Sequence, residues 1–168
     1  MQEQDTYAAP PADIAEPAPR PRLAGRGERL GGAIIDGLIV LVIVLPAMYF
    51  SGYFHGVMSG VRPGFGMRAM WALIGFALFV VIQGAPLSSN GQTWGKKLLK
   101  MKIVDLAGNT PDFGRLVLLR YGVGAAIQLV PIVGGLYWIV DSLFIFGEDK
   151  RCIHDLIAGT RVVVVPAR

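Results

Sequence analysis

The sequence predicts an all-α membrane protein, a bundle of three to four transmembrane or re-entrant helices with a small cytoplasmic two-stranded β element. Of its 168 residues, 53% are hydrophobic and only 17% are charged, whereas a soluble domain has about 25% charged residues. Two apolar runs reach the length of about 20 residues that crosses a bilayer core. Two short stretches, "KMKIVDL" and "TRVVVV", have the composition of strands.

The N-terminal segment, residues 1–24, is rich in proline and alanine and otherwise polar. Such a segment cannot bury enough apolar surface to fold alone, so we expect a disordered cytoplasmic tail. It also lacks the apolar region of a signal peptide. Residues 25–168 are predicted to form one membrane domain.

The first helix is predicted at about residues 29–50, and it contains one carboxylate, Asp36. Residues 51–67 are rich in glycine, which predicts an irregular loop. Because this loop carries only Arg62, whereas four arginines precede the helix, the positive-inside rule places the N-terminus in the cytoplasm. Those four residues are Arg20, Arg22, Arg26 and Arg29.

The second helix is predicted at about residues 68–87, and after Arg68 its one strongly polar side chain is Gln83. The lysine-rich loop after it, residues 88–110, is expected in the cytoplasm. Its "GQTWGKK" sequence faintly resembles a phosphate-binding loop, but the spacing and the last residue do not fit. We interpret it as a turn that carries basic membrane anchors.

Two further helices are predicted at about residues 111–129 and 133–146. Thr110 is expected to cap the first of them, with Pro111 in its first turn. The apolar run is too long for one untilted crossing, and "PIVGG" at residues 131–135 is the natural break. Either a surface helix leads into one span, or the two helices form a hairpin. We favour the hairpin, with both termini inside, because the two strands must meet on one side of the membrane.

A carboxylate at the centre of a membrane helix costs about 2.5 to 3.5 kcal/mol, so we expect Asp36 to face the protein interior. Arg29 lies on the same helix face but about 10.5 Å away in rise, too far for a direct pair along a straight helix. Arg120 is predicted to pair with Asp36 or with Asp141. Such pairs either fix the helix register or form a proton or cation site, and the sequence leaves both open.

Nothing in the sequence predicts an enzyme, a cofactor or a metal site. Cys152 is the only cysteine, so there is no internal disulfide. His154 and Asp155 are adjacent, and adjacent side chains diverge, so Asp155 is interpreted as a hydrogen-bonding or capping residue. The basic clusters flank apolar runs, which is typical of membrane topology signals and not of nucleic-acid binding.

Three stretches together resemble the RDD family of small bacterial membrane proteins: "RLGGAIIDGLIV", "GQTWGKKLLKMKIVDLAGNTPDFGRLVLLR" and "HDLIAGTRVVV". The resemblance covers about residues 26–165. It implies that Arg29 and Asp36 are the family's arginine and first aspartate. Asp155 is favoured as the second aspartate, and Asp141 is the other candidate.

The resemblance also implies a location in the bacterial inner membrane and a role in transport, because some members are similar to cation/proton antiporters. We therefore expect monovalent cation/proton exchange, or a subunit of an exchanger, with Asp36 as the binding carboxylate and Arg29 or Arg120 tuning it. The chain is small for a transporter, so a homo-oligomer or a partner membrane protein is expected. The alternative is a non-transporting scaffold that docks a partner through its cytoplasmic loop. The candidate ion- or proton-binding residues are Asp36, Arg29, Asp155, Asp141 and Arg120.

Overall fold

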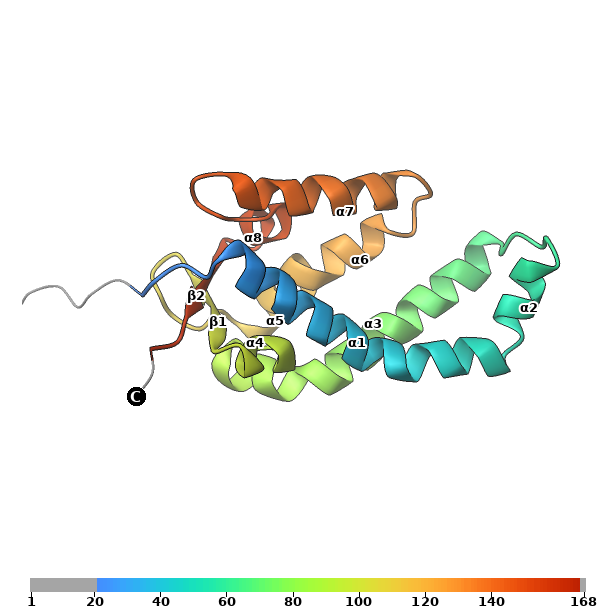
Figure 1. Cartoon of the computed structure of the whole chain (residues 1–168), viewed down its shortest axis with the longest axis horizontal. Helices are drawn as coiled ribbons and strands as arrows, with labels where there is room; N and C mark the ends of the chain where they lie inside the picture. Colours follow the sequence, from blue (N-terminus) through green and yellow to red (C-terminus); the bar gives the residue numbers. More distant parts are fainter. Residues whose placement is uncertain (1–20, 167–168) are drawn as a thin grey trace, which may run out of the picture.

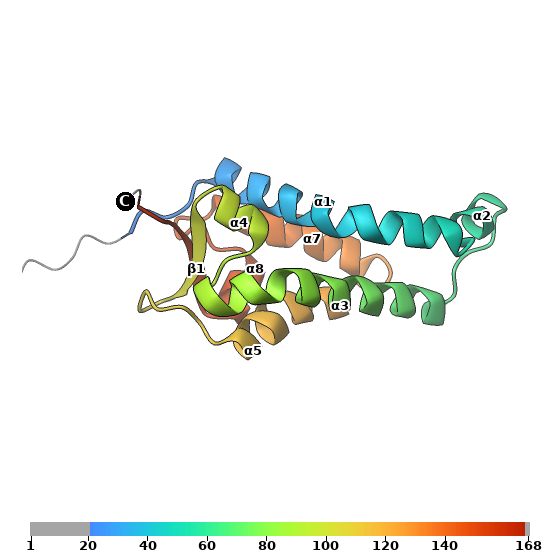
Figure 2. The ribbon, with the colours of Figure 1, turned by 90° about the horizontal axis from the view of Figure 1, so that it is seen from below.

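The computed structural model describes residues 21–166, so the predicted tail lies outside it as far as residue 20. Two long apolar helices, α1 (Arg26–Phe50) and α3 (Phe65–Asn90), run along the long axis of the molecule (Figures 1 and 2). Both are long and apolar enough to cross a membrane, and almost none of their apolar residues are buried. They correspond to the two predicted spans, each extended at one or both ends.

The extra turns at the helix ends have local causes. At the start of α1, the Glu28 carboxylate accepts a hydrogen bond of 2.6 Å from the backbone N–H of Gly25, which satisfies a free donor of the first turn. At the end of α3, Gly91 adopts a left-handed conformation with φ of 63°, which favours glycine. The prediction of an irregular loop at 51–67 was wrong in part, because α2 (Tyr53–Met58) forms there.

The predicted strand pair is confirmed. Strand β1 (Met101–Asp105) pairs antiparallel with β2 (Thr160–Val164), with Ile103 opposite Val162. These inward-facing residues pack with Leu87 and Leu116 in the core. Leu23 forms a bridge to Val163, and Ala24 is buried. Residues 23 and 24, which the predicted tail included, are thus part of the fold.

The two shorter helical segments form the favoured hairpin. The first comprises α5 (Phe113–Arg115), the π-helical η1 (Leu116–Gly122) and α6 (Val123–Ile127), and α7 (Val133–Leu143) returns toward the sheet (Figure 1). Gly134 makes the predicted break possible, because a Cβ there would lie 2.6 Å from Gln128 Cα. The 3₁₀ turn η2 (Phe144–Phe146) and α8 (Ile153–Ile157) complete the chain before β2.

Two local predictions were wrong. Asp112, and not Thr110, caps the third helix, since its carboxylate accepts a 3.1 Å hydrogen bond from the Arg115 N–H. The "GQTWGKK" stretch is not merely a turn. Its second half begins the short helix α4 (Trp94–Leu98), which is capped by Thr93 and packed against α1.

Candidate functional site

Asp36, on α1, is buried where α1, α3 and α4 meet, and it accepts hydrogen bonds from α3, from α4 and from the N-cap residue of α4. Its Oδ1 accepts from Gln83 Nε2 at 3.1 Å and from the backbone N–H of Gly95 at 2.7 Å. Its Oδ2 accepts from Thr93 Oγ1 at 2.5 Å and lies 3.6 Å from Lys96 Nζ. We call these five residues the Asp36 cluster. The expectation that Asp36 faces the interior is met, and its partners offset the cost of burying a charge.

The short helix α4 packs against α1 and supplies most of the partners of Asp36. A Cβ at Gly95 would collide with the Gly32 carbonyl oxygen and lie 2.9 Å from Asp36 Oδ1, so only glycine allows this close approach to α1. Thr93 caps the helix and contacts the carboxylate with the same hydroxyl. Lys96 is buried, and its ammonium lies 3.3 Å from Thr93 Oγ1. The interpretation of Lys96 as a surface membrane anchor was wrong.

A second group joins α1, η1 and α8, and we call Arg29, Arg120 and Asp155 the arginine cluster. Each arginine donates to a different oxygen of the Asp155 carboxylate. Asp155 is fully buried, and the two arginines are 8% and 3% exposed. Asp155 also accepts from the Cys152 N–H at 3.0 Å, which bears out its interpretation as a hydrogen-bonding and capping residue.

The arginine cluster corrects the predicted pairing. Arg120 was expected to pair with Asp36 or Asp141, and it pairs instead with Asp155, 35 residues along the chain. Burial by itself would raise the pKa of Asp155, but the positive charges of Arg120 and Arg29 outweigh it and hold that pKa well below its usual range. The carboxylate is therefore charged at neutral pH, and neither arginine is available to Asp36.

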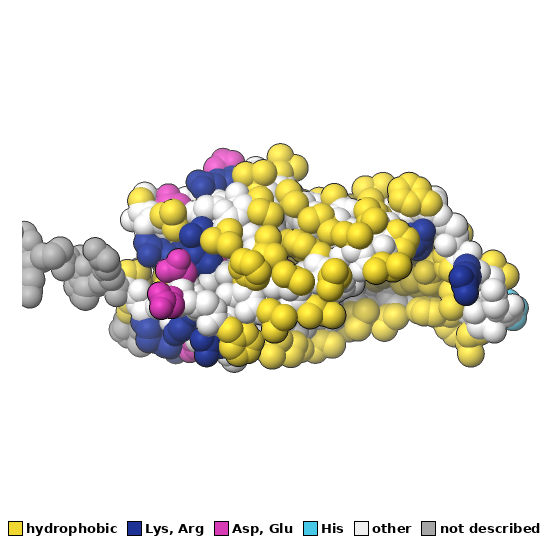
Figure 3. Space-filling view, turned by 90° about the horizontal axis from the view of Figure 1, so that it is seen from above, with side chains coloured by type: hydrophobic (Ala, Val, Ile, Leu, Met, Phe, Trp, Pro, Cys, Tyr) yellow, Lys and Arg dark blue, Asp and Glu magenta, His cyan; other side chains and the backbone are white. Residues whose placement is uncertain are grey.

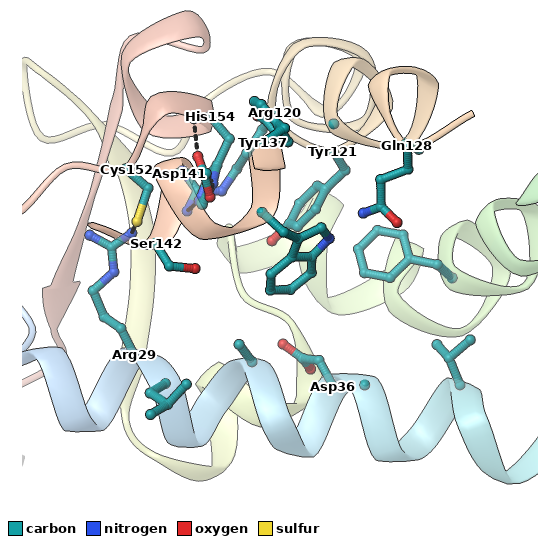
Figure 4. Close-up of a pocket in the computed structure, with 18 of the residues that line it drawn as sticks. Arg29, Asp36, Arg120, Tyr121, Gln128, Tyr137, Asp141, Ser142, Cys152 and His154 are labelled. Atoms are coloured by element: carbon teal, nitrogen blue, oxygen red, sulfur yellow. Dashed lines mark hydrogen bonds and ion pairs between the residues drawn. The ribbon is translucent and has the colours of Figure 1, made fainter. Parts of the chain in front are cut away.

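Asp141, Cys152 and His154 form a third group, the Asp141 cluster. Asp141 accepts from the His154 backbone N–H at 2.9 Å, and its Oδ2 lies 2.8 Å from His154 Nδ1 (Figure 4). Arg120 Nη2 lies 3.3 Å from His154 Nε2. Burial and the charge of Arg120 lower the pKa of His154. The ring is thus neutral, with Nδ1–H donating to Asp141 and Nε2 accepting from Arg120.

A cavity of about 770 Å³ lies between α1, α3, α6 and α7, and all three clusters contribute to its wall. The charged residues that line it include Asp36, Lys96 and Asp141, together with parts of the arginine cluster. Apolar side chains such as Val40 and Phe79 line much of the remainder, together with polar ones such as Gln128. Figure 4 shows Asp36 on α1, set apart from Asp141, Cys152 and His154 on the opposite side of the cavity.

The structure thus divides the five predicted site residues among three clusters. Arg29 joins Asp155, whereas Asp36 and Asp141 each have other partners. Sequence reasoning missed Thr93 and Lys96 as partners of Asp36. Gln83, the one strongly polar residue between Arg68 and Ser88, was noted without a role, and its isolation in an apolar run was the signal that it has a buried partner.

Comparison with known proteins gives two matches. The sequence profile of the RDD family matches residues 23–159. The chain is 28% identical over 141 residues to the uncharacterized protein YckC of Bacillus subtilis (strain 168), and the match covers 83% of each chain. No solved structure matches the chain.

Proposed function

The chain belongs to the RDD family, and from that premise we propose that it is a multi-pass protein of the bacterial inner membrane that exchanges a monovalent cation for a proton. The outer surfaces of α1 and α3 support insertion into a bilayer, because they expose large apolar side chains such as Val42 and Leu73. Charged side chains gather at the end with the sheet, as Figure 3 shows for one face. The positive-inside rule assigns that end to the cytoplasm.

The observation that carries the exchange proposal is the position of Lys96. Its ammonium lies 3.6 Å from Asp36 Oδ2 and 3.3 Å from Thr93 Oγ1, at the wall of the cavity. The ammonium is itself a monovalent cation beside two oxygen atoms, which supports the proposal that an alkali cation binds here. Oxygen atoms of this kind are the ligands that alkali cations take.

Charge balance at this site is the proposed reason that one proton is exchanged for one cation. When an external cation takes the place of the Lys96 ammonium beside Asp36, the site gains one positive charge, which the loss of one proton cancels. Lys96 then releases one proton as one cation binds, so the net charge of the site stays constant. In this scheme Asp36 binds the cation and Lys96 carries the proton, in place of the expected tuning by Arg29 or Arg120.

Proton flux in proteoliposomes tests the proposal. An imposed gradient of sodium, potassium or lithium is expected to drive proton movement in wild type. Asp36→Asn is expected to abolish it, because the binding charge is lost. Lys96→Arg keeps the positive charge but cannot release a proton at physiological pH, so it should also stop exchange.

Lys97→Arg is the matched control, because Lys97 is the next residue of α4 and is exposed. It should exchange at the wild-type rate. Wild-type rates in Lys96→Arg would exclude Lys96 as the proton carrier. Wild-type rates in Asp36→Asn would exclude the site altogether. Because the chain is small, the functional unit is proposed to be an oligomer or a complex with a partner membrane protein.

The second candidate function is a non-transporting membrane scaffold. The observation in its favour is that Asp36 accepts three hydrogen bonds that tie α1, α3 and α4 together, as structural glue would. A scaffold predicts that Asp36→Asn lowers abundance and that a partner copurifies in fixed stoichiometry. It also predicts no flux in wild type, which separates the two candidates. Neither candidate involves enzymatic chemistry.

A further inference from the structure

The Asp141 cluster brings three kinds of metal-binding atom together from two elements. One carboxylate oxygen of Asp141, the Sγ of Cys152 and a ring nitrogen of His154 all lie within 4.8 Å of one another. We propose that Asp141, Cys152 and His154 bind one divalent transition-metal ion of the zinc class. Ligand atoms around tetrahedral zinc lie roughly 3.5 Å apart, so side-chain shifts of about 1 Å bring these three to an ion.

The donor set selects the class of metal. Magnesium and calcium take oxygen ligands, whereas a thiolate sulfur with an imidazole nitrogen and a carboxylate oxygen suits zinc and its neighbours. Three protein ligands leave one coordination position open, as in zinc sites that bind water or a substrate. All three residues line the cavity, so the open position faces into it.

Backbone contacts hold the three ligands in place. Cys152 occupies the N-cap position of α8, where its N–H donates to Asp155. The His154 N–H donates to Asp141, which fixes α7 against α8. Metal on Nδ1 of His154 places the ring proton on Nε2, so Arg120 Nη2, 3.3 Å away, can no longer donate to the ring and keeps Asp155 and Thr160 as its acceptors.

The charges around the cluster favour an anionic fourth ligand. Arg29 lies 3.5 Å from the Cys152 sulfur and Arg120 lies beside His154, and the carboxylates of Asp155 and Asp141 balance them. A divalent ion with the Cys152 thiolate adds one net positive charge. An anion or a hydroxide at the open position would cancel it. The buried hydroxyls of Tyr121 and Tyr137 have no hydrogen-bond partner among the described residues, and both tyrosines line the same cavity.

Binding must displace the thiol proton to solvent. Burial raises the pKa of the Cys152 thiol to about 11, although the nearby Arg29 charge opposes this. Metal uptake should therefore strengthen as the pH rises, because the metal competes with a proton for the sulfur. The inference is independent of cation/proton exchange, since none of the three ligands contacts Asp36 or Lys96.

Metal binding is tested on the full chain, purified in detergent without a histidine tag and stripped with a chelator. Equilibrium dialysis against zinc, followed by elemental analysis, should give one ion per chain. Cobalt in place of zinc should give a thiolate-to-cobalt charge-transfer band. Cys152→Ser should remove this band, and both Cys152→Ser and His154→Ala should weaken zinc binding by at least about tenfold.

His55→Ala is the matched control, because His55 is the other histidine of the chain and is exposed on α2. It should bind zinc like wild type. Zinc binding that is unchanged in Cys152→Ser and His154→Ala would overturn the proposal, as would the absence of binding by wild type.

A measurement on wild type alone covers the case in which a variant fails to fold. Zinc should slow alkylation of Cys152 by a maleimide at least tenfold, and a chelator should restore the original rate. Alkylation at the same rate with and without zinc would overturn the proposal. Thiol protection reports on the sulfur itself, so it does not depend on any transport activity.

Discussion

Replacing Asp155 by asparagine removes the one charge that two buried arginines share. The side chain keeps its size, so the change isolates the charge and leaves the packing almost intact. Arg29 and Arg120, 8% and 3% exposed, would both remain buried without their carboxylate. Removing one member of a buried ion pair costs about 3–5 kcal/mol, because the other charge is left uncompensated. The structure places Asp155→Asn at the upper end of that range, since two charges lose their partner.

Thermal unfolding in detergent micelles, followed by circular dichroism, measures this loss. For a chain of this length, 1 kcal/mol shifts the Tm by about 2–4 °C, so a loss of about 5 kcal/mol should lower the Tm by roughly 10–20 °C. Asp149→Asn is the control, because Asp149 is exposed, and it should change stability by less than about 0.5 kcal/mol.

A further variant separates charge from packing. Arg120→Met in the Asp155→Asn background removes one of the two uncompensated charges. It should therefore be less destabilising there than in wild type. The reasoning would be refuted if Asp155→Asn unfolded at the same temperature as Asp149→Asn.

Three other variants or measurements test the local geometry. Gly95→Ala should destabilise by more than about 2 kcal/mol, because its Cβ meets the Gly32 carbonyl oxygen, whereas Gly37→Ala, with open space around it, should be tolerated. Thr93→Val removes both the cap of α4 and the hydrogen bond to Asp36, so it should lower stability by about 2 kcal/mol in a denaturant titration. Thr110→Val, at an exposed position, serves as its control. In metal-free protein, alkylation of Cys152 by iodoacetamide should rise about tenfold per pH unit up to about pH 11, because only the thiolate reacts. A plateau near pH 8.5, the range of an ordinary cysteine, would contradict the raised pKa.

The long helices, the strand pair and the break before α7 could be predicted because each has a local signal. Apolar length marks α1 and α3, alternation marks β1 and β2, and "PIVGG" marks the turn. Helix α4 has no such signal, since five residues are too few for a periodic pattern. It forms because Gly95 and Thr93 bind the Asp36 carboxylate, which is a tertiary contact and cannot be read from the chain order.

The partners of the buried charges were the least predictable part of the site. Helix periodicity places Arg120 on a face of its own segment, but the π-helical η1 shifts that face, and no local pattern indicates the shift. Asp155 was correctly interpreted as a capping residue. Its role as the partner of Arg29 and Arg120 depends on the packing of α8 against η1 and the start of α1, which only the assembled fold defines.

Proton release on cation binding tests the central claim most directly. Sodium, potassium or lithium chloride is added to purified protein in weakly buffered detergent, and the released protons are counted with a pH indicator. The account predicts about one proton per chain, lost in both Asp36→Asn and Lys96→Arg and retained in Lys97→Arg. No release by wild type, or equal release in Lys96→Arg, would contradict the assignment of Lys96 and Asp36 as an exchanging pair.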